Sequence, residues 1–382
     1  MTGPTAYACR RLFDGDMMHE DAALLVKDGS VAGGCAVSDV PDDFAIEDLG
    51  DGILVPGLVD LQVNGGGGLM LGDAETLDDV ARICQAHVPL GTTAMTPTLI
   101  TDTRETTRRI VELGMLATEN AVPGFHGLHL EGPHLSVSRK GAHDAALIRP
   151  MENEDVAFYL EAVDRLPSLM MTVAPETVTP EQTAVLSKAG IHVSLGHTGA
   201  GYERCRQAAN AGATCVTHLF NAMSPLQHRE PGLVGAALDL GTLNAGLIAD
   251  GIHVDPVAIR IALNSKTGPG RIFLVTDAMS QTGTDVASFT LGGRKIFRQN
   301  GMLTLADGTL AGADIDLPAS IRFLVDHIGV DLETALAMAT SIPADVIRKP
   351  IGRLNSGCVA DFVLLSTPDF GVKRVWLGGR SQ

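Results

Sequence analysis

Short apolar runs that end at turn residues recur through the middle of the chain. Such runs are typical of buried parallel strands, and we place them at 58–63, 92–96, 125–130, 170–174, 191–196, 214–218, 244–249 and 271–276. Helix-like stretches lie between them, at 76–89, 103–118, 153–166, 201–211 and 255–265. Eight strands alternating with helices predict an α/β fold, a closed (β/α)8 TIM-like barrel. The alternative is an open, doubly wound sheet.

The two ends of the chain follow a different pattern. Short β-like runs broken by glycine, aspartate and proline occupy residues 5–55, and the same style returns in 351–382. We therefore predict a small β-sandwich domain built from residues 1–55 and 351–382, and a catalytic barrel domain at 56–350. The segment 288–312 predicts a hairpin inserted after the last barrel strand.

The amino-acid composition argues against some classes of function. A chain of 382 residues with 45% hydrophobic residues can bury a large core, and its net charge of −17 argues against a nucleic-acid partner. An anionic substrate would need a local cluster of donors. No apolar run reaches membrane-spanning length and the first residues lack a signal-peptide pattern, so we expect a cytoplasmic protein without membrane contact. Six scattered cysteines predict reduced thiols.

Four chemically versatile side chains stand at the ends of predicted strands: Glu131, His197, His218 and Asp277. In a barrel, the carboxyl ends of the strands face one mouth, where the chemistry is found. Glu131, His197 and His218 match the oxygen and nitrogen ligands of a catalytic zinc or iron site with one position left for water. Asp277 could accept a proton from that water and pass it to a leaving amine. For each residue alone, the alternative is an ordinary polar group at a strand end.

The first predicted barrel strand bears on the number of metal ions. Gln62 and Asn64 are two residues apart, so they point to the same side of the strand. Two-metal hydrolases of this architecture would have histidines at these positions, and amides are poor zinc ligands beside imidazole. We therefore expect one divalent ion per active site. Zinc is our expectation, and iron accepts the same ligands.

Donors for an anion follow the sixth and seventh predicted strands. Asn221 and Arg229 could bind an oxyanion or a phosphate, and His253 could join them. The alternative is a solvated pair of Arg229 and Glu230. His143 lies in a loop after the third strand, from which it could donate to a substrate carbonyl oxygen; the alternative is a surface histidine.

Five motifs in one order, P-G-L-V-D-L-Q-V-N-G, H-L-E-G-P-H-L, S-L-G-H-T, V-T-H-L-F-N-A-M-S and L-V-T-D-A-M, resemble the N-acetylglucosamine-6-phosphate deacetylases of the amidohydrolase superfamily. The resemblance covers nearly the whole chain. It implies that Glu131, His197 and His218 are the metal ligands. It also implies that Asp277 is the catalytic acid and base and that His143 polarises the acetyl carbonyl.

The resemblance further implies a substrate site and a partner. Its positions are Gln62, Asn64, Ala142, His143, Asn221, Ala222, Arg229, His253, Leu310, Ala311 and Gly312. In the family, the histidine that matches His253 reaches the phosphate in the neighbouring subunit, so a homodimer is implied. The Q-x-N in place of H-x-H resembles the single-metal branch, in agreement with the argument from Gln62 and Asn64.

The function implied is hydrolysis of N-acetyl-D-glucosamine 6-phosphate to acetate and D-glucosamine 6-phosphate, in amino-sugar catabolism and cell-wall sugar recycling. One alternative is N-acetylgalactosamine 6-phosphate, which differs in the orientation of one hydroxyl. A cyclic-amide hydrolase is a second, but it would require histidines at positions 62 and 64. A non-catalytic sugar-phosphate sensor on the same barrel is a third, and the complete ligand set with Asp277 argues against it.

Overall fold

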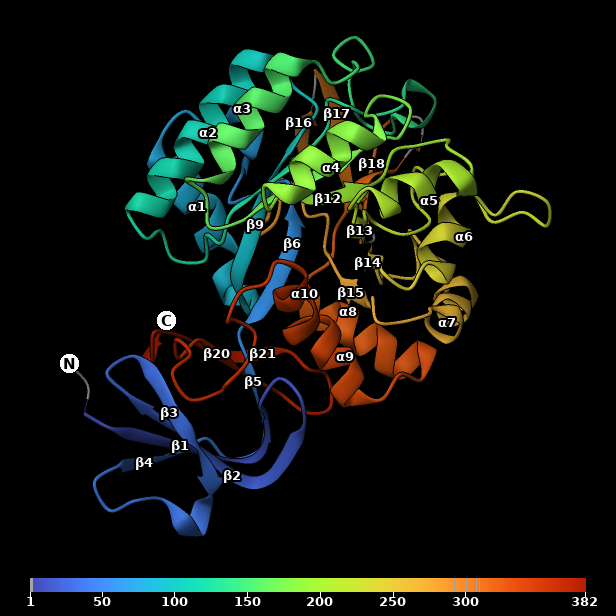
Figure 1. Ribbon diagram of the computed structural model, residues 1–382. Helices are drawn as coiled ribbons and strands as arrows, with labels where there is room; N and C mark the ends of the chain where they lie inside the picture. Colours follow the sequence, from blue (N-terminus) through green and yellow to red (C-terminus); the bar gives the residue numbers. More distant parts are fainter. Residues whose placement is uncertain (1–2, 292, 300, 307, 309) are drawn as a thin grey trace.

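The computed structural model describes residues 3–291, 293–299, 301–306, 308 and 310–382. A barrel forms the larger part and a small β domain lies at one end of it (Figure 1). The barrel sheet is parallel, with strand order β15-β14-β13-β12-β11-β10-β9-β6. Its strands are β6 (Leu58–Val63), β9 (Thr92–Ile100), β10 (Leu128–Glu131), β11 (Leu169–Val173), β12 (His192–Leu195), β13 (Cys215–Val216), β14 (Asn244–Leu247) and β15 (Ile272–Leu274).

The first and last barrel strands close the sheet on itself. The N–H of Asp277, just past β15, donates to the carbonyl of Gln62 over 3.0 Å, and the N–H of Asn64 donates to the carbonyl of Ala278 over 2.7 Å. An open sheet would leave these two edges apart. The predicted closed barrel is confirmed and the open doubly wound alternative is wrong. The closure also brings the residues that follow β6 and β15 into one place.

Helices surround the barrel between its strands. They are α1 (Leu77–His87), α2 (Arg104–Glu119), α3 (Asn153–Val163), α4 (Pro180–Lys188), α5 (Tyr202–Asn210), α6 (Gly232–Asp239), α7 (Pro256–Ser265), α8 (Leu317–Phe323), α9 (Leu332–Met338) and α10 (Ser341–Val346). Side-chain caps set several starts; for example, Thr103 accepts from the N–H of Thr106, and Asp255 accepts from that of Val257. Within the described ranges, we find no helix with the length and apolarity to cross a membrane.

Both chain ends contribute to the small domain, as predicted. Its strands are β1 (Thr5–Phe13), β2 (Met18–Lys27), β3 (Ser30–Ala36), β4 (Ala45–Asp48), β5 (Ile53–Pro56), β20 (Phe362–Leu365), β21 (Val372–Leu377) and β22 (Arg380–Ser381). They form one continuous sheet, in which β5 from the first segment pairs with β20 from the last. Tyr7, Phe362 and Trp376 pack together in its core, with ring centroids 4.6–5.5 Å apart. The six cysteines are free thiols, and four of them are buried.

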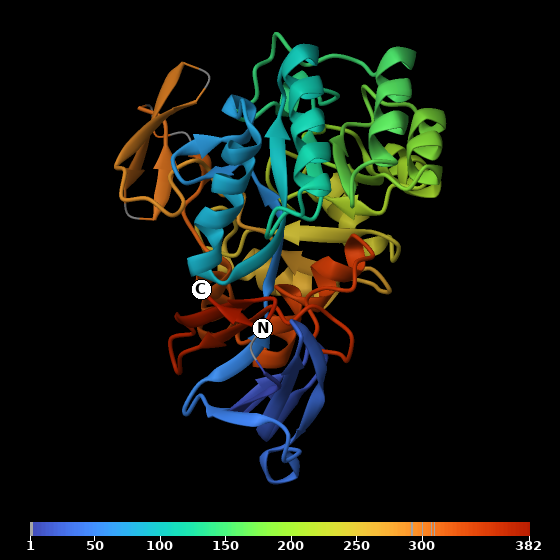
Figure 2. The ribbon, with the colours of Figure 1, turned by 90° about the vertical axis from the view of Figure 1, so that its left-hand side faces the viewer.

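The segment after β15 contains four strands, whereas the predicted hairpin would have two. It forms a four-stranded antiparallel sheet, called here the insertion sheet, from β16 (Ser288–Leu291), β17 (Arg294–Gln299), β18 (Met302–Thr304) and β19 (Leu310–Ala313). Positions 292, 300, 307 and 309 of the predicted hairpin lie outside the described residues. Figure 2 shows the insertion sheet standing at one side of the barrel mouth. A two-stranded ribbon, β7 (Gly65–Gly66) and β8 (Leu69–Met70), follows β6 at the same mouth.

Candidate active site

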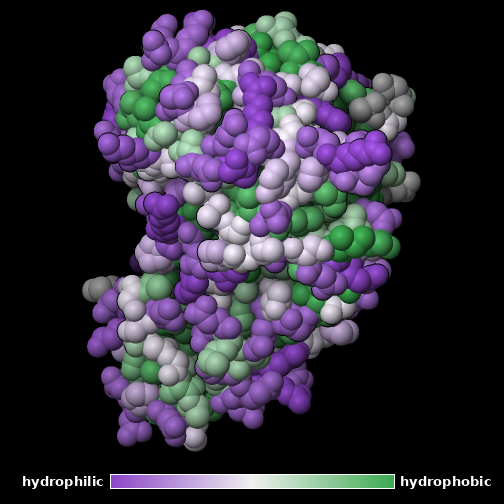
Figure 3. Space-filling model, turned by 45° about the vertical axis from the view of Figure 1, so that its right-hand side comes forward, coloured by the Kyte–Doolittle hydropathy of each residue, from purple (hydrophilic) through white to green (hydrophobic). Residues whose placement is uncertain are grey.

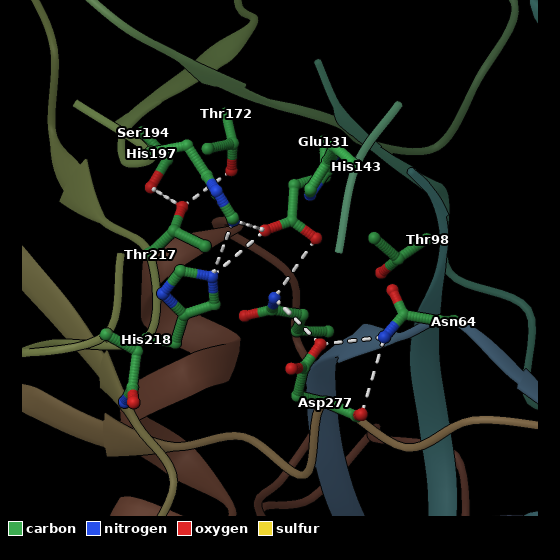
Figure 4. A network of polar contacts seen from close by, with 12 residues as sticks. Asn64, Thr98, Glu131, His143, Thr172, Ser194, His197, Thr217, His218 and Asp277 are labelled. Carbon is green, nitrogen blue, oxygen red and sulfur yellow. Dashed lines mark hydrogen bonds and ion pairs between the residues drawn. The ribbon is translucent and has the colours of Figure 1, made fainter. Parts of the chain in front are cut away.

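Three potential metal ligands converge above the barrel strands (Figure 4). Glu131 ends β10, and His197 and His218 stand just beyond β12 and β13. Oε1 of Glu131 lies 3.0 Å from Nε2 of each histidine, and the two Nε2 atoms are 3.1 Å apart. The three side chains are only 3–6% exposed. The structure therefore brings together residues that are 21 to 87 positions apart in sequence.

The hydrogen bonds around this triangle fit a divalent ion. Nδ1 of His197 lies 2.8 Å from the carbonyl oxygen of Arg139, which can only accept, so Nδ1 carries the proton and the lone pair of Nε2 points towards Glu131 and His218. Lone-pair atoms this close repel unless a cation lies among them. Ligand atoms bound tetrahedrally to zinc at 2.0–2.2 Å are roughly 3.4 Å apart, close to the separations found here. The residues present therefore suit zinc or iron.

His143 also lies beside this triangle, but its hydrogen bonds give it a different role. The backbone N–H of Thr101 donates to Nδ1 of His143 over 3.2 Å, and the Thr101 hydroxyl is 2.8 Å from the same atom. The ring proton is therefore on Nε2. Burial, and then the neighbouring His197, lowers the pKa of His143 to about 3, so the ring is neutral. Possible ligand atoms of His143, Glu131 and His197 lie within 4.8 Å of one another, yet this tautomer makes His143 a hydrogen-bond donor and leaves His218 as the candidate for the third ligand.

Asp277 is held by the two amides of β6 and the residue after it. Nδ2 of Asn64 donates to Oδ1 of Asp277 over 2.7 Å, and Nε2 of Gln62 donates to the same oxygen over 3.1 Å. Nε2 of Gln62 is also 3.3 Å from Oε2 of Glu131. Burial raises the pKa of Asp277, and the negative charge of Glu131 raises it further. A carboxyl with a raised pKa can accept a proton and release it again, which is what a general base and acid must do.

Strained backbone accompanies these side chains. His197, His218 and Asp277 adopt φ values of 45°, 29° and 53°, in the left-handed region that residues other than glycine rarely occupy. Ala222, beside the site, has a φ of 50°. Such strain concentrates at functional sites, where the surrounding structure holds it in place. The turn that follows each strand therefore directs these side chains into the mouth of the barrel.

The ligands and Asp277 line a pocket of about 200 Å³. Most of the substrate residues expected from the sequence also line it: Asn64, Ala142, His143, Asn221, Ala222, His253, Leu310 and Gly312. Ala311 lies between the last two in β19, and its side chain is outside the described part of the structure. Gln62 reaches the site through its hydrogen bonds. His253 donates from Nδ1 to Oδ2 of Asp250 over 2.6 Å.

Two expectations about the anion site concern His253 and Arg229. His253 lines the pocket of its own chain, and its reach into a neighbouring subunit stays a prediction. Arg229 is exposed on the loop between β13 and α6 and does not line the pocket. Glu230 accepts instead from the N–H of Tyr202, at the start of α5, over 2.7 Å. Among the described residues, no lysine or arginine lines this pocket.

The sequence analysis did not identify several groups that position the site residues. Thr101 fixes the tautomer of His143, and the carbonyl of Arg139 fixes that of His197. Gly141 packs beside the His197 ring, where an added Cβ would lie 3.3 Å from Cε1, and its φ of 54° suits glycine. A backbone carbonyl leaves no trace in a sequence. The glycine was the one available signal, since it precedes the candidate His143 by two residues.

Comparisons with known proteins agree with this geometry. A sequence model described as the amidohydrolase family matches residues 53–381. A Shewanella sp. (strain ANA-3) N-acetylgalactosamine-6-phosphate deacetylase is 39% identical, over 94% of this chain and 91% of the relative. A human N-acetylglucosamine-6-phosphate deacetylase is 35% identical, over 94% and 90%. A crystal structure of N-acetylglucosamine-6-phosphate deacetylase from Pasteurella multocida superposes with a TM-score of 0.93 at 32% identity, covering 99% of both chains.

Proposed function

The chain belongs to the amidohydrolase family, and on that premise we propose that it removes the acetyl group of N-acetyl-D-glucosamine 6-phosphate. The products are acetate and D-glucosamine 6-phosphate. One observation carries the proposal: a three-ligand metal site, a neutral histidine donor and a carboxyl with a raised pKa line one small pocket. Hydrolysis of an amide needs a water nucleophile, a donor for the carbonyl oxygen and a group that carries a proton to the amine.

The roles of the residues follow from their hydrogen bonds. A zinc or iron ion held by Glu131, His197 and His218 supplies, when bound, an acidified water and a positive charge. Asp277 accepts the proton of that water and then donates it to the departing amine. Nε2–H of His143 donates to the carbonyl oxygen as negative charge develops there. One ion is proposed, because the Gln62 and Asn64 amides donate to Asp277 and are poor ligands for a second ion.

The phosphate is proposed to bind where Asn221 and His253 line the pocket. Among the residues described in the structure, no lysine or arginine lines this part of the pocket, and Arg229 lies on an exposed loop. We therefore propose a homodimer in which this loop, and not His253, crosses to the neighbouring site. The same loop also exposes an apolar side chain that a partner would cover, since Leu226 is 55% exposed.

The molecular surface and the proposed substrate indicate where in the cell the protein acts. The face in Figure 3 is largely hydrophilic, with separate hydrophobic areas, in keeping with the charge of −17. A phosphorylated sugar does not cross a bilayer, because moving its charge into an apolar medium is too costly. We therefore propose a cytoplasmic enzyme of amino-sugar catabolism or cell-wall sugar recycling.

N-acetyl-D-galactosamine 6-phosphate is the second candidate substrate, favoured by the 39% identical Shewanella relative. Steady-state acetate release from both sugar phosphates, with and without a chelator, tests both. We expect chelator-sensitive release from the glucosamine compound at the higher kcat/KM. A higher kcat/KM on the galactosamine compound would reassign the substrate. If the metal-loaded protein released acetate from neither compound, the proposed reaction would be refuted.

A further inference from the structure

One side of β6 is polar along its whole length. Asp60, Gln62 and Asn64 are spaced two apart, so they lie on the same side of the strand, and each is at most 2% exposed. The two amides hold Asp277 at the barrel mouth. Asp60 lies one step deeper along the strand, and the proposed reaction does not use it. A buried carboxyl in this column therefore has a role still to be assigned.

Asp60 bridges the seam of the barrel, where β6 meets the residues that follow β15. Its Oδ2 accepts from the Thr276 hydroxyl over 2.6 Å, and the backbone N–H of Thr276 lies 3.3 Å from both carboxylate oxygens. Its Oδ1 accepts from the N–H of Gln62 over 3.1 Å. One side chain thus binds donors from both sides of the seam, 216 positions apart in the case of Thr276.

The backbone of β6 explains why a side chain is needed there. The two backbone hydrogen bonds that close the seam lie near the mouth. Towards the start of β6, the N–H of Val59 donates to the carbonyl of Ala339, between α9 and α10, over 2.8 Å. Between these points, Asp60 accepts from the N–H groups of Gln62 and Thr276. Because a buried N–H group without an acceptor is costly, the carboxylate replaces backbone acceptors in this stretch.

The contacts of Asp60 favour its ionised form. The two N–H groups can only donate, and the Thr276 hydroxyl already accepts from the N–H of Ala278 over 3.2 Å, so its own proton is directed to Asp60. Burial raises the pKa of Asp60 to about 7, and the hydrogen bonds from Thr276 and Gln62 oppose that rise. A buried carboxylate is costly unless it is hydrogen-bonded, so the charge and the geometry of the seam depend on each other.

These contacts hold the backbone on either side of Asp277. Asp60 binds the residue before it, Thr276, and the Thr276 hydroxyl binds the residue after it, Ala278. Asp277 itself has a φ of 53°, a strained value that its surroundings must maintain. On the other strand, Asp60 binds the N–H of Gln62, whose side chain donates to Asp277. Asp60 is therefore linked to Asp277 through both strands.

We propose that Asp60 is a positioning residue for the proton carrier: its carboxylate joins the two strands of the seam and so directs Asp277 at the reacting centre. The inference rests on the proposed function, in which Asp277 carries the proton. Neither Asp60 nor Thr276 lines the active-site pocket, so both act through Asp277 and not on the substrate. Their loss should lower kcat and leave KM and metal content unchanged.

Asp60→Asn is the first test. It puts an NH2 group, which cannot accept, among the donors of Gln62 and Thr276, so the seam must shift. We expect kcat to fall at least about tenfold with KM within about twofold of the wild type, because small displacements of a reacting group are expensive. A folded variant that keeps kcat within about twofold would overturn the proposal.

Two substitutions of Thr276 test the same bridge if Asp60→Asn does not fold. Thr276→Val removes the hydroxyl and should lower kcat about fivefold, whereas Thr276→Ser keeps it and should stay within about twofold of the wild type. Thr96→Val is the matched control, since Thr96 is fully buried and donates to the carbonyl of Leu61 over 2.9 Å from β9, on the other side of β6. Equal rates for the two Thr276 variants, or the same loss in the control, would contradict the bridge.

Hydrogen exchange measures the bridge without the reaction. The segment 271–280 should exchange faster in Asp60→Asn than in the wild type, and Thr96→Val should leave it unchanged, because Asp60 protects the N–H of Thr276. Unchanged exchange in Asp60→Asn would overturn the proposal. If exchange behaved as expected but the metal-loaded wild type released no acetate, the proposed function would fail and the bridge would stand.

Discussion

The backbone N–H of Thr101 donates to Nδ1 of His143 over 3.2 Å, and the Thr101 hydroxyl lies 2.8 Å from the same nitrogen. These two donors hold the proton of His143 on Nε2, the atom proposed to donate to the substrate carbonyl. Thr101, the residue after β9, thus sets the tautomer of His143, which lies 42 positions later in the chain. Thr101 is a positioning residue, because it acts through His143.

Thr101→Val should lower kcat about fivefold with little change in KM, since it removes a hydrogen bond worth about 1 kcal/mol and keeps the backbone donor. Steady-state kinetics check this. Thr107→Val is the matched control, because Thr107 is buried in α2 and donates only to the carbonyl of Thr103 over 2.8 Å. An unchanged kcat in Thr101→Val, with the same loss of thermal stability as the control, would leave Thr101 a purely structural residue.

Asp277→Asn should lower kcat by about a thousandfold, because an amide cannot carry the proton from water to the amine. The metal ligands are untouched, so metal content and substrate binding should stay close to those of the wild type. Single-turnover acetate release, elemental analysis and calorimetric titration of the substrate measure these quantities. Turnover near the wild-type rate would rule out Asp277 as the proton carrier.

Metal analysis should find one divalent ion per chain. Removing it with a chelator should abolish acetate release, and added zinc should restore it. His218→Ala should lose the ion, because two protein ligands remain of the three. His253→Ala, in the same pocket but without contact to the triangle, is the control and should keep it. Two tightly bound ions per chain would contradict the argument from Gln62 and Asn64.

Stability should depend on pH through Asp155 of α3. Its carboxylate is 6% exposed and accepts from Arg149 over 2.5 and 2.6 Å. Burial raises its pKa, but the hydrogen bonds from Arg149, from the Glu152 N–H and from Arg104 together outweigh burial and hold the pKa below its usual value. A lowered pKa contributes stability that is present above about pH 4 and is lost as the pH falls through the folded-state pKa.

Asp155→Asn should therefore lower the free energy of unfolding by about 2 kcal/mol or more at pH 7, and by progressively less below about pH 4. Urea unfolding at a series of pH values measures the difference. Glu154→Gln is the control on the same helix, because Glu154 forms only an exposed pair with Arg108 at 3.0 Å. A loss that does not change with pH would show that packing, and not the ion pair, is responsible.

The barrel could be predicted because the sequence pattern that indicates each of its strands is local. Each buried strand is a short apolar run, and the residues that end those runs, Glu131, His197, His218 and Asp277, stand out by type alone. The insertion sheet was underestimated, because its strands pair across short turns without a strong apolar pattern. Arg229 was expected at the phosphate from its sequence position; it is exposed and does not line the pocket of its own chain, so this role stays a prediction.

The sequence by itself determined the fold class, the ligand types and the absence of histidines at positions 62 and 64, because residue type and strand periodicity follow from the order of residues. Only the tertiary structure decided which tautomers His143 and His197 adopt, that two amides hold Asp277, and that Asp60 joins β6 to the residues after β15. These features depend on contacts between distant segments, in which backbone groups common to all residues act as partners. Closure of the barrel creates those contacts.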